Sequence, residues 1–259
     1  MLAGLVVNGI VDAANISASH PREDRRADLA ARYGIRTYES NAEAARELAG
    51  HENSADVLCV KPQRLKKVLA DLDGVIHVEQ LVVSIVAGAT ISHLAQEFGT
   101  AKVVRAMPNT PSQIGAGITA WTCTNAVDET ERSHVREMLS ALGKELFVET
   151  ENMIDMATSL SATGPTYIFM VMEALTDAGV HMGFSRDMAK ELVQETMLGS
   201  VKFAMASHKH PAELRNMVTS PGGTSAEAIY QMEKGSLRTV LSKAVYSAYK
   251  RAVELGKKS

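Results

Sequence analysis

Three almost uninterrupted runs of apolar, mostly β-branched residues in the first half of the chain constrain its fold most strongly. They are ADVLCV (55–60), LVVSIVAG (81–88) and KVVRAM (102–107), and stretches with the periodicity of amphipathic helices separate them. Strands that are apolar along their whole length are typical of parallel sheets, because helices bury such strands on both faces. The first half therefore predicts an α/β domain.

The pattern of the chain changes near residue 150. The further elements expected before that point are helices at 2–14, 22–33, 41–50 and 128–141, helices that open at Pro62 and near Ser92, and strands at 16–19, 35–38, 117–124 and 145–150. Beyond it strand patterns stop, and helical periodicity dominates over 152–206 and 224–255. We therefore expect a sheet domain at 1–150 and a helical domain at 151–259.

Composition excludes several classes of function. The net charge of −3 gives no general attraction to nucleic acid or to an anionic membrane. The longest apolar stretch, at 81–89, is too short to span a bilayer, and the first residues lack the basic start of a signal peptide. Cys59 and Cys123 lie in apolar runs, which favours buried free thiols, and their separation has no zinc spacing. A soluble, cytoplasmic protein without a bound metal is expected.

Polar and small residues follow each of the three apolar runs. Lys61 follows the first run, Ala87 and Gly88 end the second, and Met107 through Asn109 end the third. In parallel sheets these carboxyl ends meet at one edge, which is where ligands bind. An ordinary strand-to-helix turn explains any one of these segments alone, but three at one edge favour a cofactor crevice.

The strand expected at 16–19 ends in Ser19, and His20 and Arg22 come after it. At this place an acidic residue usually binds the ribose hydroxyls of NAD. A hydroxyl and a guanidinium instead suit the 2′-phosphate of NADP, since arginine pairs with phosphate through two hydrogen bonds. A solvated helix start is the alternative interpretation, because Glu23 and Asp24 follow at once.

The segment VTSPGGTS, residues 218–225, precedes a predicted helix. Two glycines and several hydroxyls at a helix start form a nest of backbone N–H donors that binds a carboxylate or a phosphate. A simple capping turn is the alternative. Glu173 and Asp177 share a helix face and are capable of acid–base chemistry, but a pair of solvated charges is the more usual role.

The helical half contains stretches with few charges, such as YIFMVMEAL at 167–175. A helix with such a face buries more surface by pairing with another copy of the chain. We therefore infer a homodimer. Many of the methionines lie in this half, where they are expected to fill gaps between packed helices rather than to bind a cofactor.

At this point the residues resemble a known family, pyrroline-5-carboxylate reductase, over essentially the whole chain. The segments that carry the resemblance are VKPQ (60–63), SIVAG (84–88), RAMPNTPSQIGAG (105–117), SLSATGPTYIF (159–169), EALTDAGVHMG (173–183), HPAELRNMVTSPGGTS (210–225) and MEKGSLR (232–238). They occur in the order of that family, and the MPNTP segment and the 218–225 loop are its most specific features.

The resemblance implies reduction of Δ1-pyrroline-5-carboxylate to L-proline with NADPH or NADH. It implies a Rossmann-like domain followed by an all-α dimerisation domain, in a homodimer or a larger assembly of dimers. By this likeness the residues that face the cofactor are Asn41, Lys61, Ala87, Met107 and Asn109. The residues that hold the substrate, from the partner subunit, are Val218, Ser220, Gly223, Thr224 and Ser225. The Ser225 hydroxyl is expected to hydrogen-bond the imine nitrogen.

The chain departs from the family pattern in three places. Residues 161–164 read Ser-Ala-Thr-Gly where the family has Ser-Gly-Ser-Gly, and Ser225 replaces a usual threonine. The first strand and its glycine-rich turn are missing, and Gly4 and Gly9 lie in a predicted helix. A sheet without its central strand is expected to leave unpaired backbone on both neighbouring strands. The alternatives are a start that lies upstream, or a cofactor-impaired or non-catalytic paralogue that dimerises or binds an imino acid.

Overall fold

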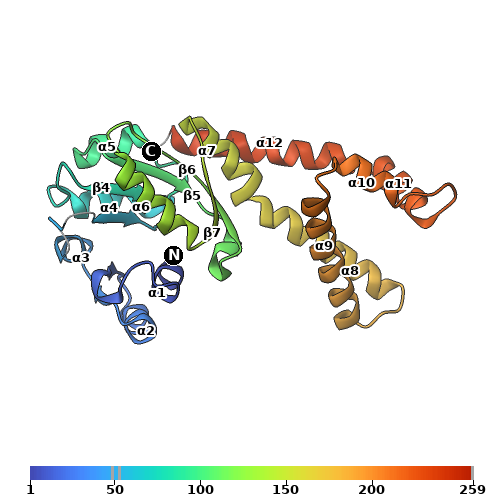
Figure 1. The fold of residues 1–259 in the computed structure, drawn as a ribbon, viewed down its shortest axis with the longest axis horizontal. Coiled ribbons are helices and arrows are strands. Elements are labelled where there is room, and N and C mark those ends of the chain that lie inside the picture. The colour runs from blue at the N-terminus through green and yellow to red at the C-terminus, as the bar shows by residue number, and fades with distance from the viewer. Residues whose placement is uncertain (48–49, 52–53, 258–259) are drawn as a thin grey trace. The chain divides into compact units, whose positions relative to one another are not determined.

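The computed structural model describes residues 1–47, 50–51 and 54–257. They form two compact units (Figure 1), Met1–Thr163 with Ser247–Ser259, and Gly164–Tyr246. These units are not divided at residue 150, because the helices that follow the sheet and the end of the last helix pack in the first unit. The division into domains at 1–150 and 151–259 stays a prediction.

The first unit is built on a five-stranded sheet in the order β3-β4-β5-β6-β7. The strands are β3 (Ala55–Leu58), β4 (Leu81–Ser84), β5 (Val103–Met107), β6 (Gly117–Cys123) and β7 (Gly143–Phe147). The first three are parallel, which confirms the predicted Rossmann-like sheet. β6 runs antiparallel to β5, since their connection holds only a short 3-10 helix, Thr110–Ile114, and a parallel crossover needs about a dozen residues.

Helices cover both faces of this sheet. α4 (Pro62–Leu72) and α5 (Ile91–Phe98) pack on one face, and α6 (Glu129–Ser140) packs on the other. The buried side chains of α4, at Leu65, Val68, Leu69 and Leu72, recur at helical spacing. α6 begins with a capping box of Asp128 and Glu131, which satisfies two backbone donors at once.

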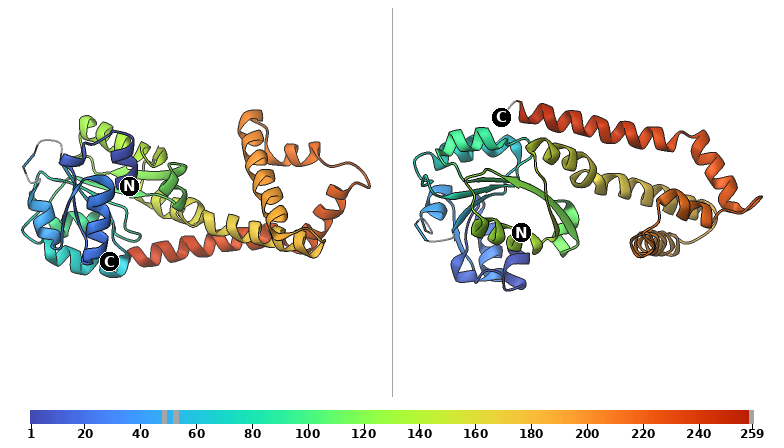
Figure 2. Two further views of the ribbon diagram at one scale, coloured as in Figure 1. Left: turned by 90° about the horizontal axis from the view of Figure 1, so that it is seen from below. Right: turned by 45° about the horizontal axis from the view of Figure 1, so that its top comes forward.

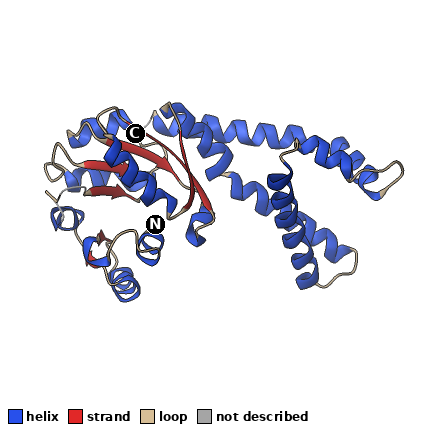
Figure 3. Ribbon diagram, in the orientation of Figure 1, coloured by secondary structure: helices blue, strands red, loops and turns tan. Residues whose placement is uncertain are grey.

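A separate two-stranded sheet precedes the five-stranded one (Figure 3). It consists of β1 (Ser17–Ser19) and β2 (Arg36–Tyr38), with α2 (Glu23–Tyr33) between them and α3 (Asn41–Glu47) after them. In the described part of the chain no strand joins β1 to β3. The sheet is thus divided at the place where the sequence predicts that a strand is missing. Residues 48–49 of the expected helix 41–50 lie outside the described residues.

The single helix expected at 2–14 is wrong. α1 spans Leu2–Val7, and a 3-10 helix follows at Ala13–Asn15. Gly9 has φ +65°, a left-handed conformation that ends helices. Gly4 lies against the end of α6, where an added Cβ would approach the Ala141 carbonyl oxygen to 2.6 Å. These two glycines are therefore explained by packing and by a helix end.

The two cysteines are free thiols, as expected, but the expected burial is wrong for Cys59, which is exposed. Cys59 follows β3, the outer strand of the larger sheet, so no neighbouring strand covers it. Cys123, at the end of β6, is partly buried.

Asp56 in β3 is a partly buried carboxyl whose pKa rises to about 6, because burial penalises its charged form. The folded state then binds the proton more tightly than the unfolded chain, whose carboxyl has a pKa of about 4. Stability from this site is present below about pH 4 and is lost as the pH rises through about 6. We expect Asp56→Asn to raise the free energy of unfolding at about pH 8 by roughly 1–2 kcal/mol after solvent screening, and to leave it unchanged at about pH 4. Urea unfolding at the two pH values measures this difference. An equal gain at both pH values would contradict this account.

The last helices of the first unit are α7 (Glu151–Ala157), which runs into a π-helix at Thr158–Ala162, and the end of α12 (Leu237–Gly256). The second unit contains α8 (Gly164–His181), α9 (Arg186–Ser207), α10 (Pro211–Met217), α11 (Thr224–Lys234) and the start of α12 (Figure 2). The described residues after β7 are thus helical or in turns, as the sequence predicts. None of the described helices is long and apolar enough to cross a membrane.

α8 and α9 pack closely against each other. An added Cβ on Gly179 would lie 2.9 Å from the Ala189 Cβ, so a small residue is required there. Arg186 Nη1 pairs with Asp177 Oδ1 at 2.9 Å. Asp177 therefore has a structural partner, which favours surface charges over an acid–base pair as the role of Glu173 and Asp177.

Large apolar side chains are exposed along α8 and α9. Phe169 is 56% exposed, Met170 64%, Phe203 53% and Met205 72%. Soluble monomers rarely expose so many large apolar groups on neighbouring helices, so this surface is suited to contact with another protein chain.

Candidate functional site

The turns after β4 and β5 lie at the same edge of the sheet, because these strands are parallel. Ala87, in the turn after β4, packs against the apolar cluster that contains Met107, the last residue of β5. The structure therefore brings together two of the predicted cofactor residues. The Met107 side chain belongs to the core, so Met107 meets this edge through its backbone.

Gly88, which ends the second apolar run, is explained by packing within the chain. Its φ is +81°, and an added Cβ would lie 2.9 Å from the Leu255 Cβ and 3.0 Å from the Leu255 carbonyl carbon. The glycine is therefore required by the end of α12, which packs on this turn. Ala87 is left as the small residue that faces the edge.

Asn109 fixes the turn after β5. Its Oδ1 accepts a hydrogen bond from the backbone N–H of Ile118 at 3.0 Å, which ties the turn to β6. Since Oδ1 is used in this way, Nδ2 is the group that Asn109 offers to a ligand.

A chain of hydrogen bonds joins the ends of three elements near β1. Ser19 Oγ donates to Asn41 Oδ1 at 2.6 Å, and Asn41 Nδ2 donates to Asp71 Oδ2 at 2.9 Å. Ser19 ends β1, Asn41 begins α3 and Asp71 lies in α4. The structure thus brings the predicted cofactor residues Ser19 and Asn41 into contact, and Asp71 sets the orientation of the Asn41 amide.

Arg22 and Lys61 are not held against these groups. Arg22 pairs with Asp24, with its side chain 67% exposed, and this guanidinium lowers the pKa of the Asp24 carboxyl. Lys61 is exposed at the start of α4. Arg26, which the sequence analysis did not single out, is the more buried cation, and its Nη1 donates to the His20 carbonyl oxygen at 2.8 Å.

The chemistry of these residues matches the two ends of a nicotinamide dinucleotide. The hydroxyl and amide of Ser19 and Asn41 suit the adenosine ribose, and the small Ala87 beside the Asn109 amide suits the nicotinamide. Between these ends, the described residues contain no glycine-rich strand-to-helix turn of the kind that binds a pyrophosphate.

The predicted substrate loop connects α10 to α11 in the second unit. Ser220 and Gly223 close a turn through a hydrogen bond of 3.0 Å from the Gly223 N–H to the Ser220 carbonyl oxygen. Pro221 and Gly222 occupy its centre, and the φ of +70° at Gly222 matches a type II turn. Thr219 Oγ1 donates to the Arg215 carbonyl oxygen at 2.7 Å, which anchors the loop to α10.

Gly223 is the residue at which this loop becomes a helix. An added Cβ would lie 2.5 Å from Ser220 Oγ and 3.2 Å from the Ser220 carbonyl oxygen, so a side chain fits only if the Ser220 hydroxyl turns away and the turn gives slightly. The amides of Thr224 and Ser225, at the start of α11, have no acceptor within the helix. Val218, Ser220 and Thr224 are exposed, and Ser225 is partly buried in the first helical turn. The five predicted substrate residues thus lie on one loop that presents free N–H donors.

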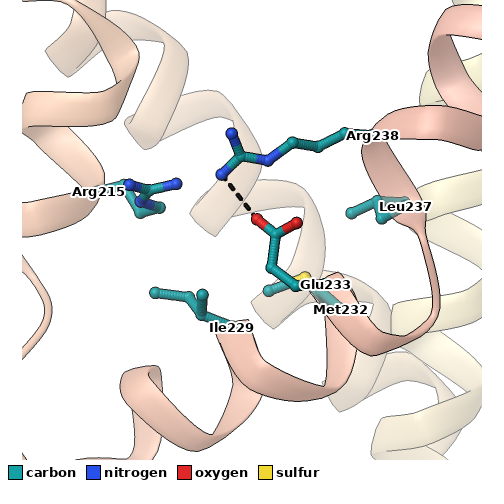
Figure 4. A pocket seen from close by; sticks show the side chains of 6 residues that line it. All are labelled: Arg215, Ile229, Met232, Glu233, Leu237 and Arg238. Carbon is teal, nitrogen blue, oxygen red and sulfur yellow. Dashed lines mark ion pairs between the residues drawn. The ribbon is translucent and has the colours of Figure 1, made fainter.

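A pocket of about 200 Å³ lies between the helices that flank this loop (Figure 4). Its lining residues are Arg215, Ile229, Met232, Glu233, Leu237 and Arg238. Arg238 Nη2 pairs with Glu233 Oε1 at 2.7 Å, which connects the end of α11 to the start of α12. Figure 4 shows the Arg215 guanidinium on the other side of the pocket. The helix that follows the loop, α11, is therefore held to the start of α12 by the ion pair of Glu233 and Arg238.

Sequence reasoning missed three charged residues that meet inside the first unit, Arg105, Glu151 and Asp155. Arg105 Nη1 lies 2.9 Å from Glu151 Oε1, and Nη2 lies 2.7 Å from Asp155 Oδ1. Two signals were available. A charge inside an apolar strand needs a partner, and two carboxylates spaced by four residues share a helix face.

Two family models match the chain. The model for pyrroline-5-carboxylate reductase dimerisation matches residues 151–255, and the model for the coenzyme F420-dependent NADP oxidoreductase matches residues 1–88. The two matches fall on the helical part and on the start of the sheet part.

Relatives and solved structures resemble the chain over almost its whole length. A pyrroline-5-carboxylate reductase from Synechocystis is 36% identical, covering 100% of this chain and 94% of the relative. The structure of a pyrroline-5-carboxylate reductase from Coxiella burnetii has a TM-score of 0.86 and 34% identity, over 98% of this chain and 93% of that one. A Plasmodium falciparum pyrroline carboxylate reductase with NADP bound has a TM-score of 0.87 and 30% identity, with the same shares covered.

Proposed function

Since the chain belongs to the pyrroline-5-carboxylate reductase family, we propose that it reduces Δ1-pyrroline-5-carboxylate to L-proline with NADPH or NADH. The observation that carries the proposal is the donor-rich loop at the start of α11. It combines free amides, a glycine packed closely against Ser220 and a hydroxyl at Ser225. Such a loop suits a small ring that carries one carboxylate.

The chain's residues position the substrate in this mechanism. The amides of Thr224 and Ser225 hold its carboxylate, with Gly223 leaving space and Val218 and Ser220 bordering the ring. The bound nicotinamide supplies the hydride for the imine carbon. The Ser225 hydroxyl donates a hydrogen bond to the ring nitrogen and keeps it oriented, and the nitrogen takes up one proton from solvent as the imine becomes an amine. Holding the substrate and the cofactor in the reacting geometry supplies much of the rate of such a reaction.

The cofactor is held at the carboxyl ends of the parallel strands. Ser19 and Asn41 bind the adenosine ribose, and Ala87 with the Met107–Asn109 backbone borders the nicotinamide. Arg22 and Lys61, both exposed at the starts of α2 and α4, approach the ribose phosphate and the pyrophosphate. Ser19 at the end of β1, in place of an acidic residue, supports NADPH as the preferred nucleotide.

The active assembly is a homodimer or a larger assembly of dimers. The exposed apolar side chains of α8 and α9 support this, as does the match to a dimerisation model. The substrate loop of one subunit then completes the cofactor edge of its partner.

The proposal is tested by following NADPH fluorescence with the purified chain and pyrroline-5-carboxylate. We expect oxidation of NADPH that depends on the imino acid and yields proline. No oxidation of NADPH in the presence of the imino acid, or oxidation that yields no proline, would reject the proposal.

Ser225→Ala should lower kcat about tenfold to 100-fold and change the NADPH dissociation constant little, because it removes one hydrogen bond to the reacting ring. Ser225→Thr keeps the hydroxyl and serves as the matched variant, with kcat near the wild-type value. Steady-state kinetics for both substrates separates the effects. Equal kcat in the alanine and threonine variants would remove Ser225 from the mechanism.

A further inference from the structure

Arg105 is an arginine in the middle of a buried strand. Its side chain is 1% exposed, and every residue of β5 is buried. A guanidinium at such a position is tolerated only when carboxylates and hydrogen bonds compensate for the lost water. The partners of Arg105 therefore define a built site inside the first unit.

Both partners come from one face of α7. Glu151 and Asp155 lie one helical turn apart, and each accepts one arm of the guanidinium, at 2.9 Å and 2.7 Å respectively. This fork holds α7 against β5. Of the two carboxylates, Asp155 is the more buried, with a side chain 15% exposed against 31% for Glu151.

Glu151 has a second contact that Asp155 lacks. The same oxygen, Oε1, accepts a hydrogen bond of 2.8 Å from the backbone N–H of Ile91. Ile91 is the first residue of α5, and its amide has no acceptor within that helix. One carboxylate oxygen thus joins the strand β5 to the turn that precedes α5.

The two groups that Glu151 contacts, Arg105 and the Ile91 N–H, lie close in sequence to the turns after β5 and β4, which border the nicotinamide in the proposed function. Arg105 is two residues before Met107, and Ile91 is four residues after Ala87. Movement of either group shifts one turn relative to the other, and misplacement by about 1 Å is enough to weaken a site strongly. Asp155 holds only the strand.

We propose that Glu151 is a positioning residue of the cofactor site, which fixes the turn after β4 relative to the turn after β5 through Ile91 and Arg105. The inference rests on the proposed function for its effect on nucleotide binding. If the ion pairs served stability alone, loss of Asp155 would have the larger effect, because its contact is shorter and more buried. The proposal predicts instead that loss of Glu151 has the larger effect on nucleotide binding.

The test compares Glu151→Ala with Asp155→Ala in the full chain. We expect Glu151→Ala to raise the NADPH dissociation constant about tenfold and Asp155→Ala to leave it near the wild-type value, although Asp155→Ala lowers Tm more. Glu151→Gln, which keeps an oxygen for Ile91, should restore most of the affinity. Glu131→Gln is the control, because Glu131 pairs with Lys102 at 2.9 Å near the other end of β5.

Ile91→Pro provides a second test that leaves all three charges in place. It removes the N–H that Glu151 accepts together with the isoleucine side chain, which packs against the core. Proline is tolerated at this first helical position, after a Thr90 whose ψ of 151° suits a following proline. It should raise the NADPH dissociation constant about tenfold, as Glu151→Ala does. Ile91→Ala, which keeps the N–H, should not.

Hydrogen exchange tests, without any nucleotide, whether Glu151 fixes the turn that precedes α5. The amides of residues 89–91 should exchange faster in Glu151→Ala and remain protected in Asp155→Ala. Exchange that is unchanged in Glu151→Ala, or affinity losses that follow Tm in both variants, would overturn the proposal. If the wild type bound no NADPH, the proposed function would fail, and the exchange result would still decide the role of Glu151.

Discussion

Replacing Gly223 by alanine should lower kcat/KM for pyrroline-5-carboxylate about 100-fold or more and leave the NADPH dissociation constant unchanged. The added Cβ would lie 2.5 Å from Ser220 Oγ and 3.2 Å from the Ser220 carbonyl oxygen. The Ser220 hydroxyl must therefore turn away and the turn must widen by a few tenths of an ångström, which displaces the amides of Thr224 and Ser225 from the substrate carboxylate. Steady-state kinetics and fluorescence titration with NADPH measure the two effects.

Gly199→Ala is the matched control in the same unit. Gly199 lies within α9, and nothing approaches an added Cβ within 4 Å, so alanine should be tolerated. Gel filtration of both variants checks that assembly is unchanged. Equal activity of Gly223→Ala and the wild type would show that the loop does not hold the substrate.

Gly88→Ala should destabilise the first unit by roughly 2–4 kcal/mol, the sum of left-handed strain and overpacking. The new Cβ would meet Leu255 at 2.9 Å and the Gly256 backbone nitrogen at 3.2 Å, so the end of α12 must move off the sheet edge. Urea unfolding of the full chain measures the loss.

Gly99→Ala isolates the packing part of this effect. Gly99 has a similar left-handed φ of +65°, but nothing lies within 4 Å of an added Cβ. It should lose only about 1–2 kcal/mol. If both variants lost the same stability, the contact of Gly88 with α12 would contribute nothing.

The strands and the substrate loop were predictable because their signals are local. The apolar runs of β3, β4 and β5 need burial on both faces, and the loop combines proline, glycine and hydroxyls in consecutive positions. Its five residues share one turn, so their proximity follows from the chain itself. Whether they bind substrate remains a prediction.

Other features depend on contacts between distant residues, which periodicity does not encode. The antiparallel direction of β6 follows from a short connection, and the role of Gly88 follows from a helix end more than 160 residues later. The cofactor edge was predicted in part, since Ser19 meets Asn41 and Ala87 lies near Met107, but Asp71 and the Arg105 network were not. The prediction of one helix over 2–14 is wrong because Gly9 adopts a left-handed conformation, which periodicity does not reveal.

The most direct test of the central claim is transfer of deuterium to the product from NADPH that carries deuterium at both C4 positions of the nicotinamide. The account predicts proline that carries one deuterium on the carbon of the former imine, formed by the wild-type chain and strongly reduced in Gly223→Ala. Unlabelled proline, or no proline from a chain that binds NADPH, would contradict the claim that this protein transfers hydride to pyrroline-5-carboxylate.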